Sequence, residues 1–214
     1  GIKKKLVKYV LRKADVITTD GMHIVTKLKT EWGIEDVKLI QFGVDCEIFK
    51  PDPLLKSETP FIVCRGGNSS IYDTETFKKA MGGIVQNKVK QGVEFQILEG
   101  IPSADMPNIL NKAWIYVSCT KSDAGLSMTT AEAMACGLPV IVSDFGDNVK
   151  WVGWDWCFKP GNYETLANRI VFLINDKKQR ELFGKRNRDK ILGNDNYTVE
   201  MAKMENIYKE ACNG

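Results

Sequence analysis

The stretch Asp123-Ala-Gly-Leu-Ser-Met-Thr-Thr-Ala-Glu-Ala-Met-Ala-Cys-Gly-Leu-Pro-Val-Ile-Val-Ser-Asp144 has the pattern of a loop, a short helix and a buried strand in immediate succession. Gly125 permits a backbone turn that other residues rarely adopt, and hydroxyl side chains follow where a helix must satisfy its first free N–H groups. Alanine-rich sequence continues the helix until Gly137 and Pro139 end it, and the apolar run from Val140 is typical of a strand. A helix that starts after a glycine turn presents its N-terminus to anions. The stretch therefore predicts a phosphate-binding turn.

Glu132 lies in the first turns of this expected helix and has two interpretations. Thr129 and Glu132 have the spacing of a capping box, in which the glutamate only stabilises the helix start. Alternatively, the carboxylate contacts a molecule bound at the helix N-terminus. Spacing alone leaves both open.

The whole stretch resembles the donor-binding motif of the family 4 (group 1) retaining glycosyltransferases of the GT-B fold. In that family a Ser-x-x-Glu-Gly-Phe-Gly run leads into Glu-Ala-Met-Ala-x-Gly-x-Pro-Val, and this chain has Glu132-Ala-Met-Ala-Cys-Gly-Leu-Pro-Val140. The resemblance implies that Glu132 binds the ribose hydroxyls of a nucleotide sugar. It also implies that the diphosphate meets the backbone of Gly125, Leu126, Ser127 and Met128.

The chain departs from this motif at the earlier carboxylate, which falls on Ala124. Asp123 stands one place upstream. Asp123 has two interpretations. In the first, a shift of the loop lets its carboxylate replace the missing one, contact the donor sugar and act in catalysis. In the second, it is an ordinary loop aspartate.

A second candidate group follows the apolar run 60–65, which is typical of a buried strand. Arg65 ends this run, and Gly66 and Gly67 come directly after it. Ligands of open parallel sheets bind outside the carboxyl ends of the strands, so we expect Arg65 to face the ligand crevice. A lone arginine after a strand is otherwise more often part of a surface ion pair.

The same resemblance extends to this segment. Family members carry Gly-Arg and, six residues on, Lys-Gly, and both cations neutralise the leaving nucleoside diphosphate; Arg65 matches the first, and Ile71 occupies the lysine position. Lys121 is the candidate replacement. The turn 101–106, which ends at Met106, corresponds to the place where family members contact the nucleotide base, largely through backbone.

Strand-like and helix-like segments alternate along the chain, which predicts an α/β fold with a Rossmann-like parallel sheet and helices on both faces. We expect strands at 14–19, 37–41, 60–65, 93–100, 114–118 and 140–142, and helices at 21–32, 74–89, 107–112, 180–190 and 197–211. The resemblance divides the chain into 1–44, the end of an N-terminal Rossmann domain with its linker; 45–195, the nucleotide-sugar-binding domain; and 196–214, a helix that returns toward the N-terminal domain.

Composition is that of an ordinary globular protein. The chain has 214 residues, 43% of them hydrophobic and 27% charged, which is enough for one domain with additional elements. A two-domain GT-B enzyme is longer, so we expect an incomplete chain. It opens at Gly1-Ile2-Lys3 without a signal peptide or a membrane-spanning apolar run, and the expected location is the cytoplasm.

Charge is concentrated at the N-terminus. The net charge is +3, yet the first thirteen residues hold six lysines and arginines and no acid. No basic stripe recurs, which argues against nucleic acid as a partner. Ile2, Leu6, Tyr9 and Val10 recur at helical spacing, so this segment is either a solvated helix packed on its domain or a peripheral contact with the inner membrane face.

Cysteine, histidine and tryptophan provide no catalytic or metal-binding pattern. The six cysteines are scattered without a Cys-x-x-Cys pair, which favours buried thiols in a reducing compartment, and no metal site is expected. The single histidine, His23, is interpreted as a surface or packing residue. Aromatic clusters of this kind are more often core than ligand platforms, so core packing is expected for Trp151, Trp154 and Trp156.

The resemblance implies a hexosyltransferase of polysaccharide biosynthesis for which this chain supplies the donor half. Its donor would be a UDP- or GDP-sugar, with no further cofactor required, and its acceptor a glycan or a lipid-linked molecule. A nucleotide-sugar epimerase or a phosphorylase-like enzyme is a weaker alternative, because neither normally carries this motif. The main alternative is a pseudoenzyme that binds a nucleotide or a partner chain, since Ala124 and Ile71 replace two expected polar groups.

Overall fold

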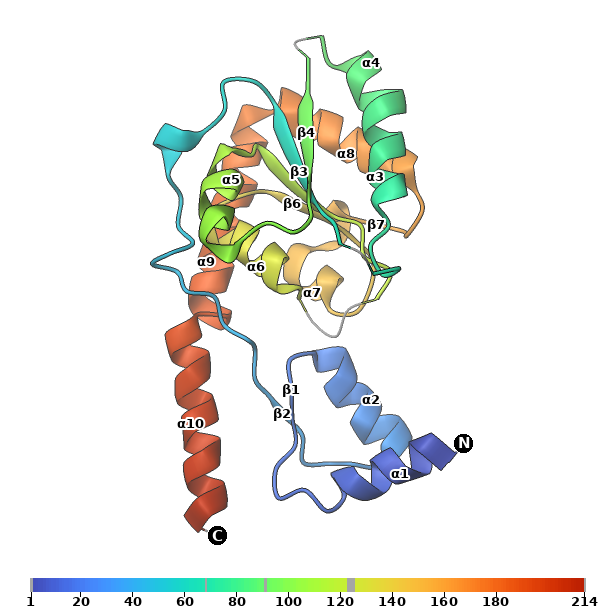
Figure 1. The fold of residues 1–214 in the computed structure, drawn as a ribbon, viewed down its shortest axis with the longest axis vertical. Coiled ribbons are helices and arrows are strands. Elements are labelled where there is room, and N and C mark those ends of the chain that lie inside the picture. Colours follow the sequence, from blue (N-terminus) through green and yellow to red (C-terminus); the bar gives the residue numbers. More distant parts are fainter. Residues whose placement is uncertain (1, 68, 91, 123–125, 214) are drawn as a thin grey trace.

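Five apolar runs form one parallel sheet in the computed structural model, which describes residues 2–67, 69–90, 92–122 and 126–213 (Figure 1). The strand order is β4-β3-β5-β6-β7. Strands β5 and β6 are buried along their whole length, as expected of a parallel sheet covered on both faces. The expected α/β class is confirmed. The strands are β3 (Phe61–Arg65), β4 (Glu94–Leu98), β5 (Ile115–Ser118), β6 (Val140–Ser143) and β7 (Cys157–Phe158).

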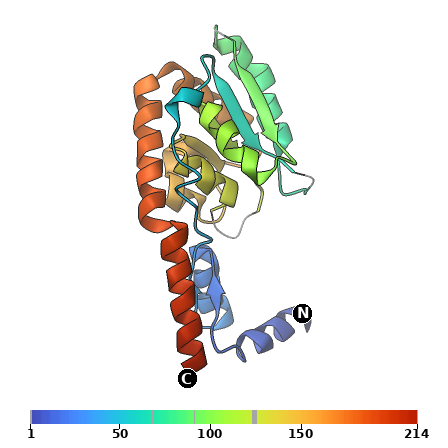
Figure 2. The same cartoon turned by 60° about the vertical axis from the view of Figure 1, so that its left-hand side comes forward.

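Helices cover both faces of this sheet (Figures 1 and 2). One layer is formed by α3 (Thr74–Ala80), η2 (Met81–Val85), α4 (Gln86–Lys88) and α8 (Tyr163–Asn175); the other by α5 (Met106–Lys112), α6 (Met128–Ala135) and α9 (Lys177–Asn194). Short elements complete this part of the chain: η1 (Pro53–Leu55), η3 (Ser103–Asp105), α7 (Asn148–Val152) and η4 (Trp154–Trp156).

The expected single helix 74–89 is interrupted. Its middle, η2, has the wider hydrogen-bonding pattern of a π-helix and contains Gly82 and Gly83. Two adjacent glycines weaken an α-helix because they lose more backbone freedom than other residues, which favours a local change of pitch there.

The first forty residues form a separate small unit. It consists of α1 (Ile2–Leu11), β1 (Thr18–Thr19), α2 (Met22–Trp32) and β2 (Lys38–Leu39), and its two strands pair in parallel. Both strands are shorter than expected because each has only the other as a partner. The unit has its own apolar cluster around Val25, Ile34 and Val37.

Helix α10 (Tyr197–Asn213) runs back beside this small unit (Figure 1). Three contacts hold the crossing point: Gly43 N–H donates to the Asp195 carboxylate at 3.0 Å, Val44 N–H to the Asp195 carbonyl at 2.7 Å, and Tyr197 N–H to the Val44 carbonyl at 3.0 Å. Farther along, the buried Glu200 carboxylate accepts from Gln41 N–H at 2.9 Å.

The cysteines are free thiols in the part of the chain that the structure describes. Five of them are buried, as expected, and Cys212 is exposed. No helix among the described residues is both long enough and apolar enough to cross a bilayer.

Candidate functional site

The site is assembled where the carboxyl ends of β3 and β5 meet the start of α6. Arg65 is the last residue of β3, and Ser127 is the N-cap of α6. The Ser127 hydroxyl accepts from Thr130 N–H at 3.4 Å and lies 2.6 Å from the Thr130 hydroxyl. The hydrogen bond from Arg65 to Thr129 places the start of α6 beside the end of β3.

The capping-box interpretation of Glu132 is wrong. Because Ser127 caps the helix, Glu132 lies in the second turn, beyond reach of a cap position. The Thr129 hydroxyl is also engaged elsewhere, since it accepts a hydrogen bond from Arg65 at 2.6 Å. Glu132 is therefore not required to start the helix.

Arg65 is held from two sides. Its Nη1 donates to Thr129 Oγ1 and its Nη2 to the Tyr72 hydroxyl, each at 2.6 Å. Its guanidinium also lies over the Tyr72 ring, 5.0 Å from the ring centroid. These contacts fix the plane of the guanidinium group at the carboxyl end of β3.

The two glycines after Arg65 are required by packing. A Cβ atom on Gly66 would lie 2.3 Å from Cγ2 of Ile97. On Gly67 it would lie 2.6 Å from the Tyr72 ring, which Arg65 already holds. Both glycines thus allow the chain to turn closely past its neighbours, and contact with a nucleotide stays a prediction for them.

Glu132 is half-buried near Arg65. Burial raises the pKa of its carboxyl group to about 7, and the positive charge of Arg65 opposes this rise. A half-buried carboxylate can accept hydrogen bonds from hydroxyl groups, and a nearby guanidinium can bind phosphate, so the two groups together suit a ligand that carries both.

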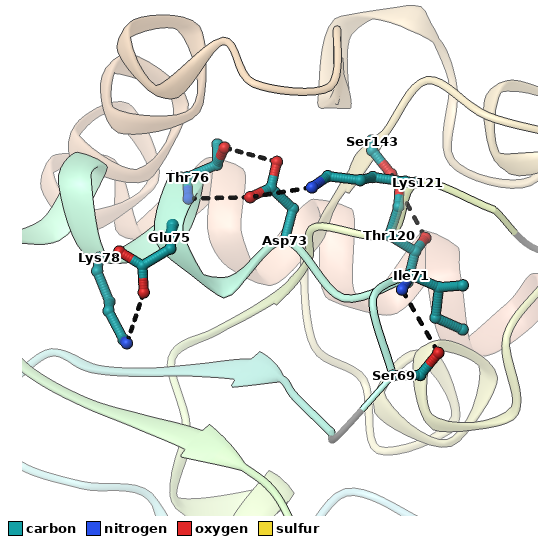
Figure 3. Close-up of polar contacts among 9 residues, drawn as sticks. All are labelled: Ser69, Ile71, Asp73, Glu75, Thr76, Lys78, Thr120, Lys121 and Ser143. Atoms are coloured by element: carbon teal, nitrogen blue, oxygen red, sulfur yellow. Dashed lines mark hydrogen bonds and ion pairs between the residues drawn. The ribbon is translucent and has the colours of Figure 1, made fainter.

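Lys121, the candidate replacement for the lysine missing at Ile71, forms an ion pair (Figure 3). Its Nζ lies 3.8 Å from Oδ1 of Asp73, and its backbone N–H donates to the Ile71 carbonyl at 2.8 Å. Asp73 in turn caps α3 by accepting from Thr76 N–H and from the Thr76 hydroxyl, at 3.4 and 2.9 Å. The ammonium group of Lys121 therefore lies at the start of α3, beside Asp73.

Backbone pairing joins the loop after β3 to the loop after β5. Tyr72 and Thr120 form an antiparallel bridge, and Asp73 N–H donates to the Cys119 carbonyl at 2.7 Å. Behind this pair, the Ser143 hydroxyl donates to the Thr120 carbonyl (Figure 3). Hydrogen bonds therefore join the described parts of the two loops to each other and to the end of β6.

The remaining predicted site residues differ in environment. Leu126 and Ser127 are buried, Met128 is exposed, and Met106 begins α5, partly buried against the core. Their contacts with a nucleotide stay predictions. Asp123 and Gly125 lie outside the described residues.

Sequence reasoning missed two partners of Arg65, Tyr72 and Thr129. A tyrosine seven residues after the arginine carries no periodic signal, because the loop between them is irregular. The capping-box interpretation placed Thr129 at the helix cap, and the stronger preference of serine for that position is the signal that favours Ser127 instead.

Asp147 also escaped sequence reasoning. Its carboxylate accepts from the backbone N–H groups of Met22 and His23 at the start of α2, at 2.5 and 3.0 Å, and so joins the small unit to the end of β6. The half-buried His23 ring lies beside the same carboxylate, Nδ1 to Oδ1 3.4 Å.

Core packing is confirmed for two of the three tryptophans. Trp151 is buried, and Trp156 stacks on Phe183 with ring centroids 4.6 Å apart. The expectation is wrong for Trp154, whose side chain is 68% exposed because the short turn η4 carries it to the surface.

Comparison with known proteins agrees with this architecture. Residues 86–190, which contain Glu132, match the family model described as "Glycosyl transferases group 1". Alpha-maltose-1-phosphate synthase of Mycobacterium tuberculosis (strain H37Rv) is 23% identical over 166 residues, which is 73% of this chain and 42% of that protein. The chain thus spans less than half the length of the curated relatives it matches.

Solved structures show the same fold. Sucrose-phosphate synthase from Thermosynechococcus elongatus superposes with a TM-score of 0.84 at 19% identity, over 98% of this chain and 61% of that one. HepE of Anabaena, solved in complex with UDP and glucose, gives 0.82 at 14% identity over 97% and 66%. The C-terminal domain of a group 1 glycosyl transferase from Francisella tularensis gives 0.63 at 18% identity over 72% and 99%. The fold is therefore that of GT-B glycosyltransferases.

Proposed function

We propose that this chain supplies the donor-binding half of a group 1 glycosyltransferase. The reaction would move a hexosyl group from a UDP- or GDP-sugar to a glycan or lipid-linked acceptor with retention. The observation that carries the proposal is the convergence of Arg65, held by Thr129 and Tyr72, with Glu132 at the start of α6. The family match over 86–190 and the UDP-bound neighbour support it.

The proposed roles follow from the chemistry of the groups. Arg65 would neutralise the nucleoside diphosphate as it leaves the anomeric carbon, assisted by the backbone N–H groups at the start of α6. Glu132 would accept hydrogen bonds from the ribose hydroxyls. The acceptor would then attack the face from which the diphosphate departs.

The proposed organisation assigns residues 45–195 to donor binding. Residues 1–44 would form the end of the acceptor-side domain with its linker, and 196–214 the helix that returns to that domain. The arrangement of α10 beside the small unit supports this division.

We also propose a peripheral membrane contact through α1, at the cytoplasmic face, for an enzyme of polysaccharide biosynthesis. No residue of α1 is buried, and Ile2, Leu6 and Tyr9 are exposed beside its lysines. Co-sedimentation with phosphatidylserine vesicles tests this: Leu6→Asp should abolish binding that Thr30→Asp, on α2, leaves intact. Equal binding of both variants would reject the contact.

The second candidate function is a nucleotide-binding pseudoenzyme. It is favoured by one observation: Ile71 occupies the lysine position, and Lys121 pairs with Asp73. Sugar transfer by the protein that contains this chain, assayed with radiolabelled UDP- and GDP-sugars, separates the two functions.

Calorimetry with UDP and GDP tests the donor site itself. We expect one of them to bind and the affinity to fall at least tenfold in Glu132→Ala. Glu164→Ala, on the surface helix α8, is the matched control. Absence of binding to both nucleotides would refute the proposal.

A further inference from the structure

A cavity lies at the edge of the sheet where the strands begin, opposite the edge that carries the candidate functional site. Its volume is about 390 Å³, which is within the range of small-molecule sites. Trp114 and Pro139, which line it, immediately precede β5 and β6, and the first turns of α9 form another wall. We call this cavity the amino-edge pocket. It is separate from the candidate site at the carboxyl ends of the strands, where Arg65 and the start of α6 lie.

Basic groups dominate the polar lining of the amino-edge pocket. Lys56, Lys177 and Arg180 face one carboxylate, Glu181, whose Oε1 lies 3.7 Å from Lys177 Nζ. Within the described residues, neither Lys56 nor Arg180 has a carboxylate within 4.0 Å. Glu181 and Asp176 act on Arg180 only from beyond this distance, so neither cation is held in a close ion pair with a described residue.

Protein contacts hold both cations in place. Lys56 Nζ donates to the Ala113 carbonyl at 2.7 Å, which leaves the other two N–H groups of the ammonium. Arg180 Nη1 donates to the carbonyls of Leu173 and Ile174, while its guanidinium lies 4.2 Å from the Trp114 ring centroid. The indole N–H of Trp114 donates to the Ser57 carbonyl at 2.8 Å, so the ring is fixed as well.

Apolar surface completes the lining, with Leu138 and Pro139 beside the indole. A ligand that fits this combination has one strongly anionic group and a small apolar body. Phosphate matches the anionic part because arginine and lysine together offer a planar fork and a point charge to its oxygens.

We propose that the amino-edge pocket binds a small organic phosphate, with its phosphate between Lys56 and Arg180 and its apolar part against Trp114 and Leu138. The pocket lies at the end of α6 distant from Ser127, so this site is independent of the proposed donor site.

Proton linkage supports the assignment. Lys56 is exposed as a whole residue, yet desolvation of its amine lowers the pKa of this group to about 8. A bound phosphate would favour the protonated amine, so binding must weaken as the pH rises from about 7 to 9. An arginine or a purely apolar contact would not produce this dependence.

Calorimetric titration with phenyl phosphate tests the proposal. The variant Arg65→Ala removes the cation of the proposed donor site, so binding there can be told apart from binding in the amino-edge pocket. Phenyl phosphate should still bind to Arg65→Ala. Its affinity should exceed that of inorganic phosphate and of phenol at least tenfold. The affinity should fall at least tenfold in Lys56→Gln and in Arg180→Gln. Lys178→Gln, a neighbour on α9 outside the pocket, should stay within twofold of the parent.

Thermal unfolding of each variant checks that the fold is retained, and Lys56→Gln should also lose the pH dependence between 7 and 9. Equal affinity for inorganic and phenyl phosphate would overturn the proposal. So would loss of binding in Arg65→Ala, or an equal loss in Lys178→Gln.

Discussion

Glu132 connects the burial of a single carboxyl group to ligand binding. With a pKa of about 7, it is mostly protonated at pH 6 and mostly ionised at pH 8. Only the carboxylate accepts hydrogen bonds through both oxygens, so the proposed ribose contact requires the ionised form.

We predict that the affinity for the nucleotide sugar rises about tenfold between pH 6 and pH 8, the change in ionised fraction expected for a pKa near 7. Calorimetry with UDP-glucose and its GDP counterpart measures it, since the diphosphate of both is fully ionised in this range. Glu132→Gln should remove the rise. A rise retained in that variant would show that another group titrates.

The same carboxyl group should lower the stability of the ligand-free protein at high pH. Its folded-state pKa lies above the unfolded value, so its contribution to stability is complete below about pH 4.5 and is lost as the pH passes about 7. At pH 8, Glu132→Gln should therefore have a higher urea midpoint than the parent protein. The corresponding gain in the free energy of unfolding is on the order of 1 kcal/mol after allowance for solvent access. Equal midpoints at pH 8 would contradict the burial of this group.

At the start of helix α6, two neighbouring hydroxyl residues have different roles. Ser127 satisfies the cap, so Thr129 is released to hold Arg65. We predict that Ser127→Ala lowers the free energy of unfolding by about 1 kcal/mol, as loss of an N-cap does. Urea unfolding measures this, and Thr129→Ser, which keeps the hydroxyl, is the matched control. A loss of this size in Thr129→Ala, with none in Ser127→Ala, would instead support the capping box.

Helix α9 approaches the turn after α6 most closely at a glycine, Gly184. A Cβ atom on Gly184 would lie 2.0 Å from the Gly137 carbonyl oxygen, whereas a Cβ on Gly193 of the same helix would meet nothing within 4 Å. We predict that Gly184→Ala destabilises the protein by more than about 2 kcal/mol, while Gly193→Ala is neutral or stabilises by up to about 1 kcal/mol. Urea unfolding of the two variants decides it; equal effects would mean that the helices do not approach closely here.

At the scale of the whole molecule, the sequence predicts the sheet better than the contacts of its loops. The β3, β5 and β6 runs are apolar and continuous because both faces of the sheet are covered, so their pattern reveals them. The strands of the small unit are overestimated, since chain propensity says nothing about how many partners a strand has. Tyr72 and Asp147 were missed because their partners, Arg65 and the start of α2, are brought to them by loop geometry and not by spacing.

The junction between the small unit and the sheet depends on a glycine with positive φ. Gly33 and Gly43 have similar φ values, 62° and 77°, so an alanine at either position is strained in the left-handed region. A Cβ on Gly43 would also lie 2.5 Å from Cα of Tyr197, whereas a Cβ on Gly33 has no neighbour within 4 Å. Comparison of alanine variants at the two positions therefore distinguishes the cost of backbone strain, which both share, from the cost of the steric contact, which only Gly43 has.

We predict that Gly33→Ala costs about 1–2 kcal/mol, the price of the left-handed conformation alone, and that Gly43→Ala costs clearly more and opens the crossing. Hydrogen exchange measures this locally. The amides of Val44 and Tyr197, which pair with Asp195 and Val44 across the junction, should exchange at least tenfold faster in Gly43→Ala than in Gly33→Ala. Equal protection in both variants would mean that α10 is held by Glu200 and its partners farther along, and that the glycine serves only to turn the chain.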